Sequence, residues 1–116
     1  MKKLTSLIFS ALVACATFVP AAAQEVKGDA KAGEKKIAMC IGCHGISGWR
    51  TAYPEVYSVP MIYGQHPAYL VKALQAYKSG ERSHPSMRGI AASLSEQDIA
   101  DLAAYYGAVA PTVAKK

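Results

Sequence analysis

The sequence has little of what marks several common protein classes. Its 116 residues include three cysteines, three histidines, two phenylalanines and one tryptophan, and 18% of them are charged. It has no run of alternating apolar residues that predicts a β-strand, and no internal repeat that would indicate a solenoid or an array. No constellation of acid and base residues indicates an enzyme active site. A chain of this length forms one domain at most.

The longest apolar stretch lies at the N-terminus and has the form of an export signal. Lys2 and Lys3 provide a basic start, residues 4–19 are mostly apolar, and residues 21–23 are the small alanines of a cleavage site. The stretch is short for a permanent membrane span, and Pro20 lies at its end. The sequence therefore predicts a secreted protein of the periplasm.

This interpretation divides the chain into two parts. Residues 1–23 are expected to be removed, and residues 24–116 to form one mature domain of about 93 residues without a transmembrane span. The alternative is a lipoprotein signal that ends at Cys15, which would then carry a lipid. The apolar run continues beyond Cys15, and this favours simple secretion.

Removal of the leader leaves two cysteines, both in the sequence Cys40-Ile41-Gly42-Cys43-His44. The CxxCH spacing predicts covalent attachment of a haem. Two thiols separated by two residues can both add to the vinyl groups of one haem, and the next histidine can then reach the iron. No further cysteine is left for a disulfide, and nothing downstream completes a zinc site.

The charge of the mature chain gives little support to nucleic-acid binding. The formal charge of +5 falls to +3 without Lys2 and Lys3, and two ionised haem propionates would lower it to about +1. The cations are scattered among acidic residues, which favours a solvated surface; steering of acidic redox partners is the second interpretation. They are Lys27, Lys31, Lys35, Lys36, Lys72, Lys78, Arg82 and Arg88.

Three helices joined by long irregular segments are expected. The first covers residues 30–39 with Asp29 as its N-cap. Gly33 is unfavourable inside this helix by about 1 kcal/mol, which indicates a close contact with another helix. The second helix begins at Pro67 and ends before Gly80. Its inward stripe consists of Leu70, Ala73, Leu74 and Tyr77.

The third helix has the clearest boundaries. Ser95 and Asp98 predict a capping box at its start, and Gly107 predicts its end. Its inward stripe consists of Ile99, Leu102, Ala103 and Tyr106. The mature chain is therefore expected to be all-α.

The order of its motifs makes the mature chain resemble small bacterial class I cytochromes c. The motifs are Cys40 to Gly45, Pro60-Met61-Ile62-Tyr63-Gly64-Gln65, Tyr69-Leu70, Ser86-Met87-Arg88, and Leu94 to Tyr106. The chain is similar above all to periplasmic monohaem members related to one half of the dihaem cytochromes. The resemblance implies a class I cytochrome c fold, with three main helices and long loops around one haem c.

The resemblance also implies which residues bind the haem. Cys40 and Cys43 would hold it covalently, and His44 would be an axial ligand of the iron. The Pro60 carbonyl would accept a hydrogen bond from the His44 ring, which fixes the tautomer and raises the basicity of the imidazole. Ile62 is a further expected haem contact.

The second axial ligand has to come from another part of the chain. The candidates are Met39, Met61, Met87, His66 and His84. Met39 is next to the cysteines, Met61 lies near the proximal side, and His66 is expected at the entry of a helix. Met87 is the assigned ligand, in an irregular loop where the family has its distal methionine, and His84 remains the alternative. Methionine ligation raises the reduction potential.

Aromatic residues are frequent between the haem motif and the second helix. Four of them, Trp49, Tyr53, Tyr57 and Tyr63, are expected to wall the haem pocket and exclude water. Tyr105 and Tyr106 are expected at the contact between the terminal helices, near Gly33.

These expectations describe a monomeric periplasmic carrier of one electron that is not an enzyme. Its redox partners would be a membrane cytochrome complex, a terminal oxidase or a periplasmic dehydrogenase, and nucleic acid is not expected. One alternative is an electron-transfer subunit of a periplasmic dehydrogenase complex. Another is a five-coordinate haem enzyme or gas sensor, in which Met87 is not bound.

Overall fold

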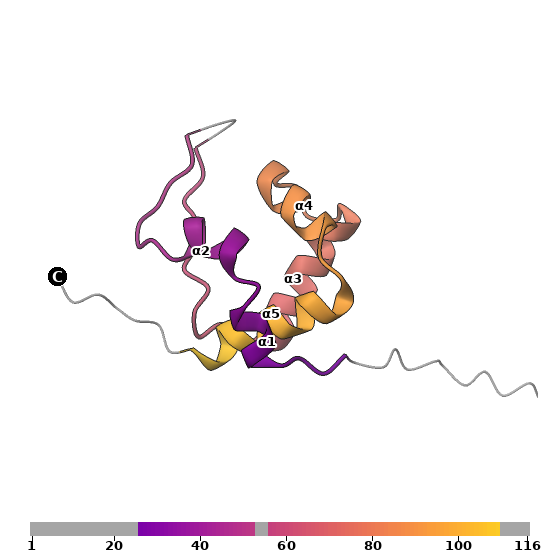
Figure 1. Cartoon of the computed structure of the whole chain (residues 1–116). Coiled ribbons are helices and arrows are strands. Elements are labelled where there is room, and N and C mark those ends of the chain that lie inside the picture. Colours follow the sequence, from indigo (N-terminus) through magenta and orange to yellow (C-terminus); the bar gives the residue numbers. More distant parts are fainter. Residues whose placement is uncertain (1–25, 53–55, 110–116) are drawn as a thin grey trace, which may run out of the picture.

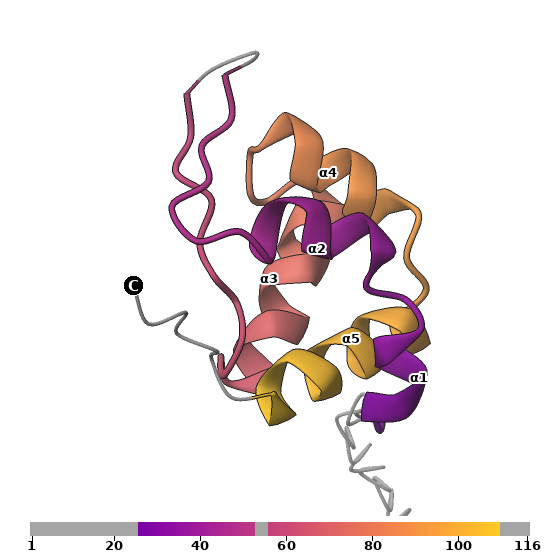
Figure 2. The ribbon, with the colours of Figure 1, turned by 60° about the vertical axis from the view of Figure 1, so that its left-hand side comes forward.

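The computed structural model describes residues 26–52 and 56–109, which form five helices. They are α1 (Ala30–Glu34), α2 (Ala38–His44), α3 (Pro67–Ser79), α4 (Pro85–Ala92) and α5 (Glu96–Ala108). Helix α1 packs against α5, and α3 packs against both α4 and α5 (Figures 1 and 2). The only β pairing within these residues is an isolated bridge between Arg50 and Ser58, so the all-α prediction is confirmed. None of their helices is long and apolar enough to cross a membrane.

The single helix expected over residues 30–39 is divided in two. Asp29 caps α1 as predicted, because its carboxylate accepts from the Lys31 N–H at 2.8 Å. The helix ends at Glu34, the chain turns over residues 35–37, and α2 then continues to His44. The expectation of one helix was wrong because contacts with α5 fix the first segment, while the turn directs α2 away from α5 (Figure 2).

The boundaries of α3 and α5 agree with the signals in the sequence. Pro67 is in the first turn of α3, and Gly80 ends this helix with a φ of 86°, which favours glycine. Ser95 and Asp98 form the predicted capping box of α5. Helix α5 passes the expected stop at Gly107 by one residue.

Helix α4 was not expected, since residues around Met87 were assigned to an irregular loop. His84 is its N-cap and Pro85 stands in its first turn. Proline fits this position because its fixed φ is helical and the first N–H groups of a helix have no partner within it. The loop prediction was wrong because Pro85 starts a helix here.

The core is formed mainly by α5. Its inward stripe, Ile99, Leu102, Ala103 and Tyr106, is buried, with exposed fractions of 2% or less. Leu70 of α3 and Leu94, the residue before the N-cap of α5, complete the cluster. The predicted stripe of α5 is therefore confirmed.

Helices α1 and α5 cross in close backbone contact at Gly33. A Cβ atom at this position would overlap the main-chain carbonyl oxygen of Asp101 and would lie 2.8 Å from the Cβ of Tyr105. Only glycine allows this approach without a shift of one helix. The predicted helix contact at Gly33 is confirmed, and Tyr105 lies beside it as expected.

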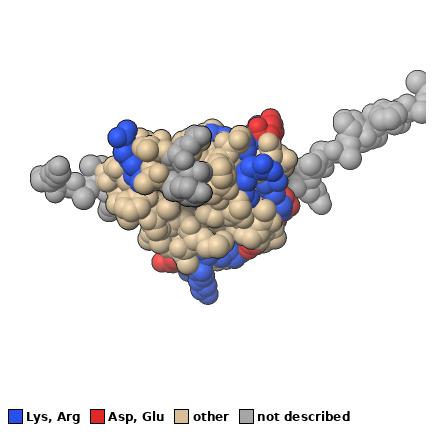
Figure 3. Space-filling view, turned by 90° about the horizontal axis from the view of Figure 1, so that it is seen from above, with Lys and Arg blue, Asp and Glu red and all other residues tan. Residues whose placement is uncertain are grey.

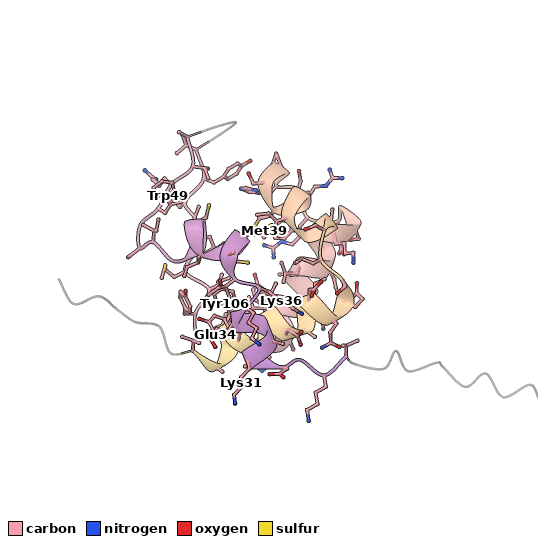
Figure 4. The ribbon with its side chains drawn as sticks, in the orientation of Figure 1. Lys31, Glu34, Lys36, Met39, Trp49 and Tyr106 are labelled. Atoms are coloured by element: carbon pink, nitrogen blue, oxygen red, sulfur yellow. The ribbon has the colours of Figure 1, made fainter. Side chains whose placement is uncertain are left out.

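A buried carboxylate holds the same crossing together. Asp101 is 2% exposed and accepts from the Asp29 N–H at 2.8 Å, from Gln97 Nε2 at 2.8 Å and from Lys36 Nζ at 2.6 Å. Lys36, labelled in Figure 4, also contacts Asp98 at 2.7 Å. The pKa of Asp101 is held below its usual value, foremost by the Lys36 ammonium and then by the Asp29 and Gln97 donors. The buried charge is thus fully paired, as burial requires.

We expect Gly33→Ala to lower the free energy of unfolding by about 2 kcal/mol, because the added methyl group forces two helices apart. Gly89→Ala is the matched control. Gly89 lies inside α4 and a Cβ there meets nothing within 4 Å, so this change should raise stability by roughly 0.5–1 kcal/mol. Chemical denaturation measures the free energy of unfolding of both variants. An equal change in this free energy for Gly33→Ala and Gly89→Ala would contradict a tight crossing at Gly33.

We expect Asp101→Asn to lower the free energy of unfolding at pH 7 by about 2 kcal/mol, the scale for a hydrogen bond to a charged group. Because the folded pKa of Asp101 lies below the unfolded value of about 3.9, its ionised form stabilises the fold above that pH. The stabilisation is lost as the pH falls through the folded pKa. The two proteins should therefore converge below about pH 4 in denaturation curves.

Glu96→Gln is the control for this experiment. Glu96 is also an acidic residue of α5 with a lysine partner, Lys78 at 3.3 Å, but its side chain is 53% exposed. Exposed ion pairs contribute little, so this variant should follow the wild-type curve. A gap between wild type and Asp101→Asn that stays constant from pH 7 to pH 3 would contradict the proposed role of the Asp101 charge.

Candidate haem-binding site

A cavity of about 450 Å³ lies between the helices and the extended segment before α3. Its volume is in the range of about 300–1,000 Å³ that is usual for ligand sites. All six residues expected at the haem line it: Cys40, Cys43, His44, Pro60, Ile62 and Met87. The inward stripe of α3 also lines it, together with Leu102, Ala103 and Tyr106 of α5. Apolar side chains therefore form most of the cavity wall, and the residues that could bind a metal occupy only a few positions in it.

Helix α2 brings the CxxCH residues to one wall of this cavity. Cys40 and Cys43 are three positions apart in the helix, so they lie on the same face, and both are free thiols. Cys40 is half-buried, and burial raises the pKa of its thiol. The next residue, His44, ends the helix.

The His44 ring is fixed by the contact expected from the sequence. Its Nδ1 atom lies 2.7 Å from the carbonyl oxygen of Pro60. A carbonyl can only accept, so Nδ1 carries the proton and Nε2 keeps its lone pair for a metal. Ile62, two residues further, lines the same cavity.

Met87 lines the cavity from α4, whereas His44 lines it from α2, and these two helices are separate in Figure 1. Of the other candidate ligands, Met39 lines the cavity from α2 beside the cysteines, and His84 lines it next to Met87. Met61 and His66 are not among the lining residues, and His66 is the N-cap of α3, as its position before Pro67 predicts.

Only part of the predicted aromatic wall is found. Tyr57 lines the cavity, whereas Trp49 does not; it is 42% exposed and lies on the outer segment in Figure 4. Tyr63 packs on Tyr106 instead, with ring centroids 5.1 Å apart. Tyr53 lies outside the described residues. The prediction failed for Trp49 and Tyr63 because aromatic content alone does not say which way an irregular segment faces.

Tyr106 is a cavity residue that the sequence placed elsewhere. It was expected beside Gly33, but it lines the cavity, and in Figure 4 it lies toward the middle of the molecule. It is 2% exposed, and within the described chain its hydroxyl has no nitrogen or oxygen partner. The hydroxyl lies near the Cys40 thiol, and burial raises its pKa. The helical position of Tyr106 predicted that it is buried, but no signal in the sequence predicted that its hydroxyl lies near the Cys40 thiol.

The residues present fit a covalently held haem. The wall of α2 offers two free thiols and an imidazole with a free Nε2, another wall offers the Met87 thioether, and the rest is largely apolar. Across residues 26–52 and 56–109, no group of three His, Cys, Asp or Glu side chains could hold a metal ion. A zinc site therefore has no ligand set in this part of the chain.

Comparisons with known proteins agree with this chemistry. The cytochrome c family matches residues 30–107. Cytochrome c-554(548) of Halomonas halodenitrificans is 44% identical over 82 residues, which cover 68% of this chain and 94% of that protein. The cytochrome subunit of sulfide dehydrogenase of Chlorobaculum tepidum is 34% identical over 93 residues, covering 79% of this chain and 80% of that one.

Among solved structures, reduced recombinant cytochrome c4 from Pseudomonas stutzeri has a TM-score of 0.57 at 37% identity. This match covers 71% of the present chain and 46% of the other. The chain spans between 37% and 51% of the length of three curated cytochrome c4 relatives. Since the family match includes both the CxxCH motif and Met87, and the Halomonas relative is covered over nearly its whole length, the chain belongs to the cytochrome c family of electron carriers with covalently bound haem c.

Proposed function

We propose that the protein is a periplasmic carrier of one electron, with a single haem c held by Cys40 and Cys43 and ligated by His44 and Met87. The observation that carries the proposal is that one apolar cavity is lined by all four residues. When bound, the haem supplies an iron that alternates between the ferrous and ferric states.

The residues of the protein orient the groups of this site in advance of electron transfer. Pro60 holds the His44 ring with Nε2 free, and the short contact of 2.7 Å keeps the ring from rotating. Met87 adds a neutral thioether, which favours the reduced state. If His44 and Met87 both bind the iron, it would have no open position for a substrate, which supports a carrier over an enzyme.

Support for the periplasm comes from the sequence of residues 1–23, which lie outside the described residues. A basic start, an apolar run and a small-residue cleavage site are the features of an export signal. We therefore propose residues 24–116 as the mature domain. Export matters for the site, because Cys40 and Cys43 become the only cysteines of the mature chain.

The partners are proposed to be redox proteins that dock briefly with a monomer. In Figure 3 the described part of the face seen from above has Lys and Arg side chains at separate places, with Asp and Glu side chains among them, and no single large basic patch. Such a surface fits a short-lived encounter better than strong electrostatic steering. A membrane cytochrome complex, a terminal oxidase and a periplasmic dehydrogenase are the candidate partners.

A dehydrogenase subunit is the second candidate function. It is favoured by the relative from Chlorobaculum tepidum, which is named as a cytochrome subunit of sulfide dehydrogenase and is covered over 80% of its length. Isolation from the native host distinguishes the two: a stable complex with a dehydrogenase supports the subunit, and a free monomer supports the mobile carrier.

We expect Met87→Ala to remove the spectroscopic signature of methionine ligation and to lower the reduction potential, since the thioether that favours ferrous iron is lost. The reduced variant should also bind carbon monoxide rapidly, because the variant leaves one axial position without its ligand. Absorption spectroscopy, redox titration and carbon monoxide binding measure these effects.

Met61→Ala is the matched control, since Met61 is 37% exposed and does not line the cavity. It should keep the wild-type spectrum and potential. If Met87→Ala kept them as well, Met87 would not be the ligand. Rapid carbon monoxide binding by the reduced wild type would instead support the five-coordinate enzyme or gas sensor.

We expect the intact mass of the secreted protein to equal residues 24–116 plus one haem, and the haem to stay on the peptide that contains Cys40 and Cys43 after proteolysis. Mass spectrometry of the protein expressed with a haem-attachment system measures both. A Cys43→Ser variant, which has lost one of the two thiols, is the control for covalent attachment. A lipid on Cys15, a retained leader or a second haem would each contradict a part of the proposal.

A further inference from the structure

His84 is tied to the backbone of Met87. It is the N-cap of α4, with φ −156° and ψ 114°, and its Nδ1 accepts from the Met87 N–H at 3.4 Å. Met87 is the third residue of this helix, so its N–H is one of the first-turn donors that has no partner within the helix. The His84 ring supplies that partner.

The same ring also contacts a second part of the cavity wall, the extended segment before α3. The rings of His84 and Tyr57 have centroids 4.4 Å apart and planes inclined by 51°. Tyr57 is itself fixed in the extended segment, because its carbonyl accepts from the Thr51 N–H and its own N–H donates to Thr51 Oγ1, both at 3.0 Å. The segment continues to Pro60, whose carbonyl orients His44.

Helix α4 needs such support. It has eight residues, and a helix this short is not stable without tertiary contacts. Because Met87 lies in its first turn, fraying at the N-terminus would move the thioether directly. The one ring of His84 both caps this turn and joins it to the segment that orients the other ligand.

We propose that His84 is a positioning residue, which with Tyr57 forms a latch that keeps Met87 in the cavity. The latch, defined as the His84 ring with its contacts to the Met87 N–H and the Tyr57 ring, slows the exchange of Met87 for external ligands. This inference rests on the proposed function, in which Met87 is the axial ligand. Because Nδ1 of His84 accepts from the Met87 N–H, Nε2 of the neutral ring carries the proton and has no free lone pair for the iron, so the ring supports the ligand and does not replace it.

The test is the rate at which imidazole displaces Met87 from the oxidised protein, followed by stopped-flow absorption. Loss of the helix cap and loss of the aromatic contact should each speed the exchange about fivefold, so His84→Ala, which loses both, should exchange roughly 25-fold faster. His84→Asn keeps a side chain that caps well and should be only about fivefold faster. This partial rescue separates the cap from the ring contact.

Tyr57→Leu, which keeps an apolar side chain in the wall, should also speed exchange about fivefold. The double variant His84→Ala with Tyr57→Leu should exchange no faster than His84→Ala, because the ring contact can be lost only once. A double variant that multiplies the two effects would show that the residues act independently and would overturn the latch.

Ser95→Ala is the matched control, because it removes the N-cap of α5, a helix end that is not part of the latch. It should reduce stability by a similar amount and leave the exchange rate within about twofold. If Ser95→Ala speeds exchange as much as His84→Ala, or if His84→Ala exchanges like wild type, the latch is wrong.

The proposed function can fail separately. If His84→Ala removes the low-spin spectrum while Met87→Ala keeps it, His84 is the ligand, and both the function's ligand assignment and the latch are overturned. If Met87→Ala removes methionine ligation but no His84 variant alters exchange, only the latch is overturned.

Discussion

The fold depends on the constraint that the inward apolar stripes of α3 and α5 both pack in one core and line a shared cavity. The stripe of α3 and three of the four stripe residues of α5 line this space, together with both cysteines of α2. A domain of this small size can bury only a modest core by itself. The prosthetic group of the family would therefore complete the interior when held by these cavity residues.

The crossing of α1 and α5 is a direct helix contact apart from the cavity lining, to which α1 contributes no residue. At the crossing of α1 and α5, Gly33 allows the backbones to meet, and Asp101 joins Lys36 to the N-terminus of α1 through the Asp29 N–H. A buried charge that bonds donors from several segments specifies one arrangement of those segments, because any other would leave it unpaired. This crossing fixes the start of α1, from which the chain turns into α2 and the haem motif.

Much of the fold was visible in the sequence, because its signals are local. The capping box of Ser95, the proline at the start of α3 and the glycine at its end each act within a few residues. The break between α1 and α2 was missed, since the contacts with α5 that fix α1 are not local. The helix at Met87 was also missed, although Pro85 in its first turn is a local signal. The spacing of the CxxCH motif predicted that its residues lie together at the cavity. The outward position of Trp49 could not be predicted, because it depends on the path of an irregular segment.

The two proposed axial ligands are held by different means, and this difference sets where the site can open. His44 follows Cys43 directly, so covalent attachment of the cysteines would hold it near the iron even if hydrogen bonds were lost. Met87 has no covalent tie of this kind and lies on a helix of eight residues. Its position depends on packing and on the contacts of the first turn of α4. Ligand exchange should therefore begin on the Met87 side, and contacts that hold α4 control how often the carrier has an open iron.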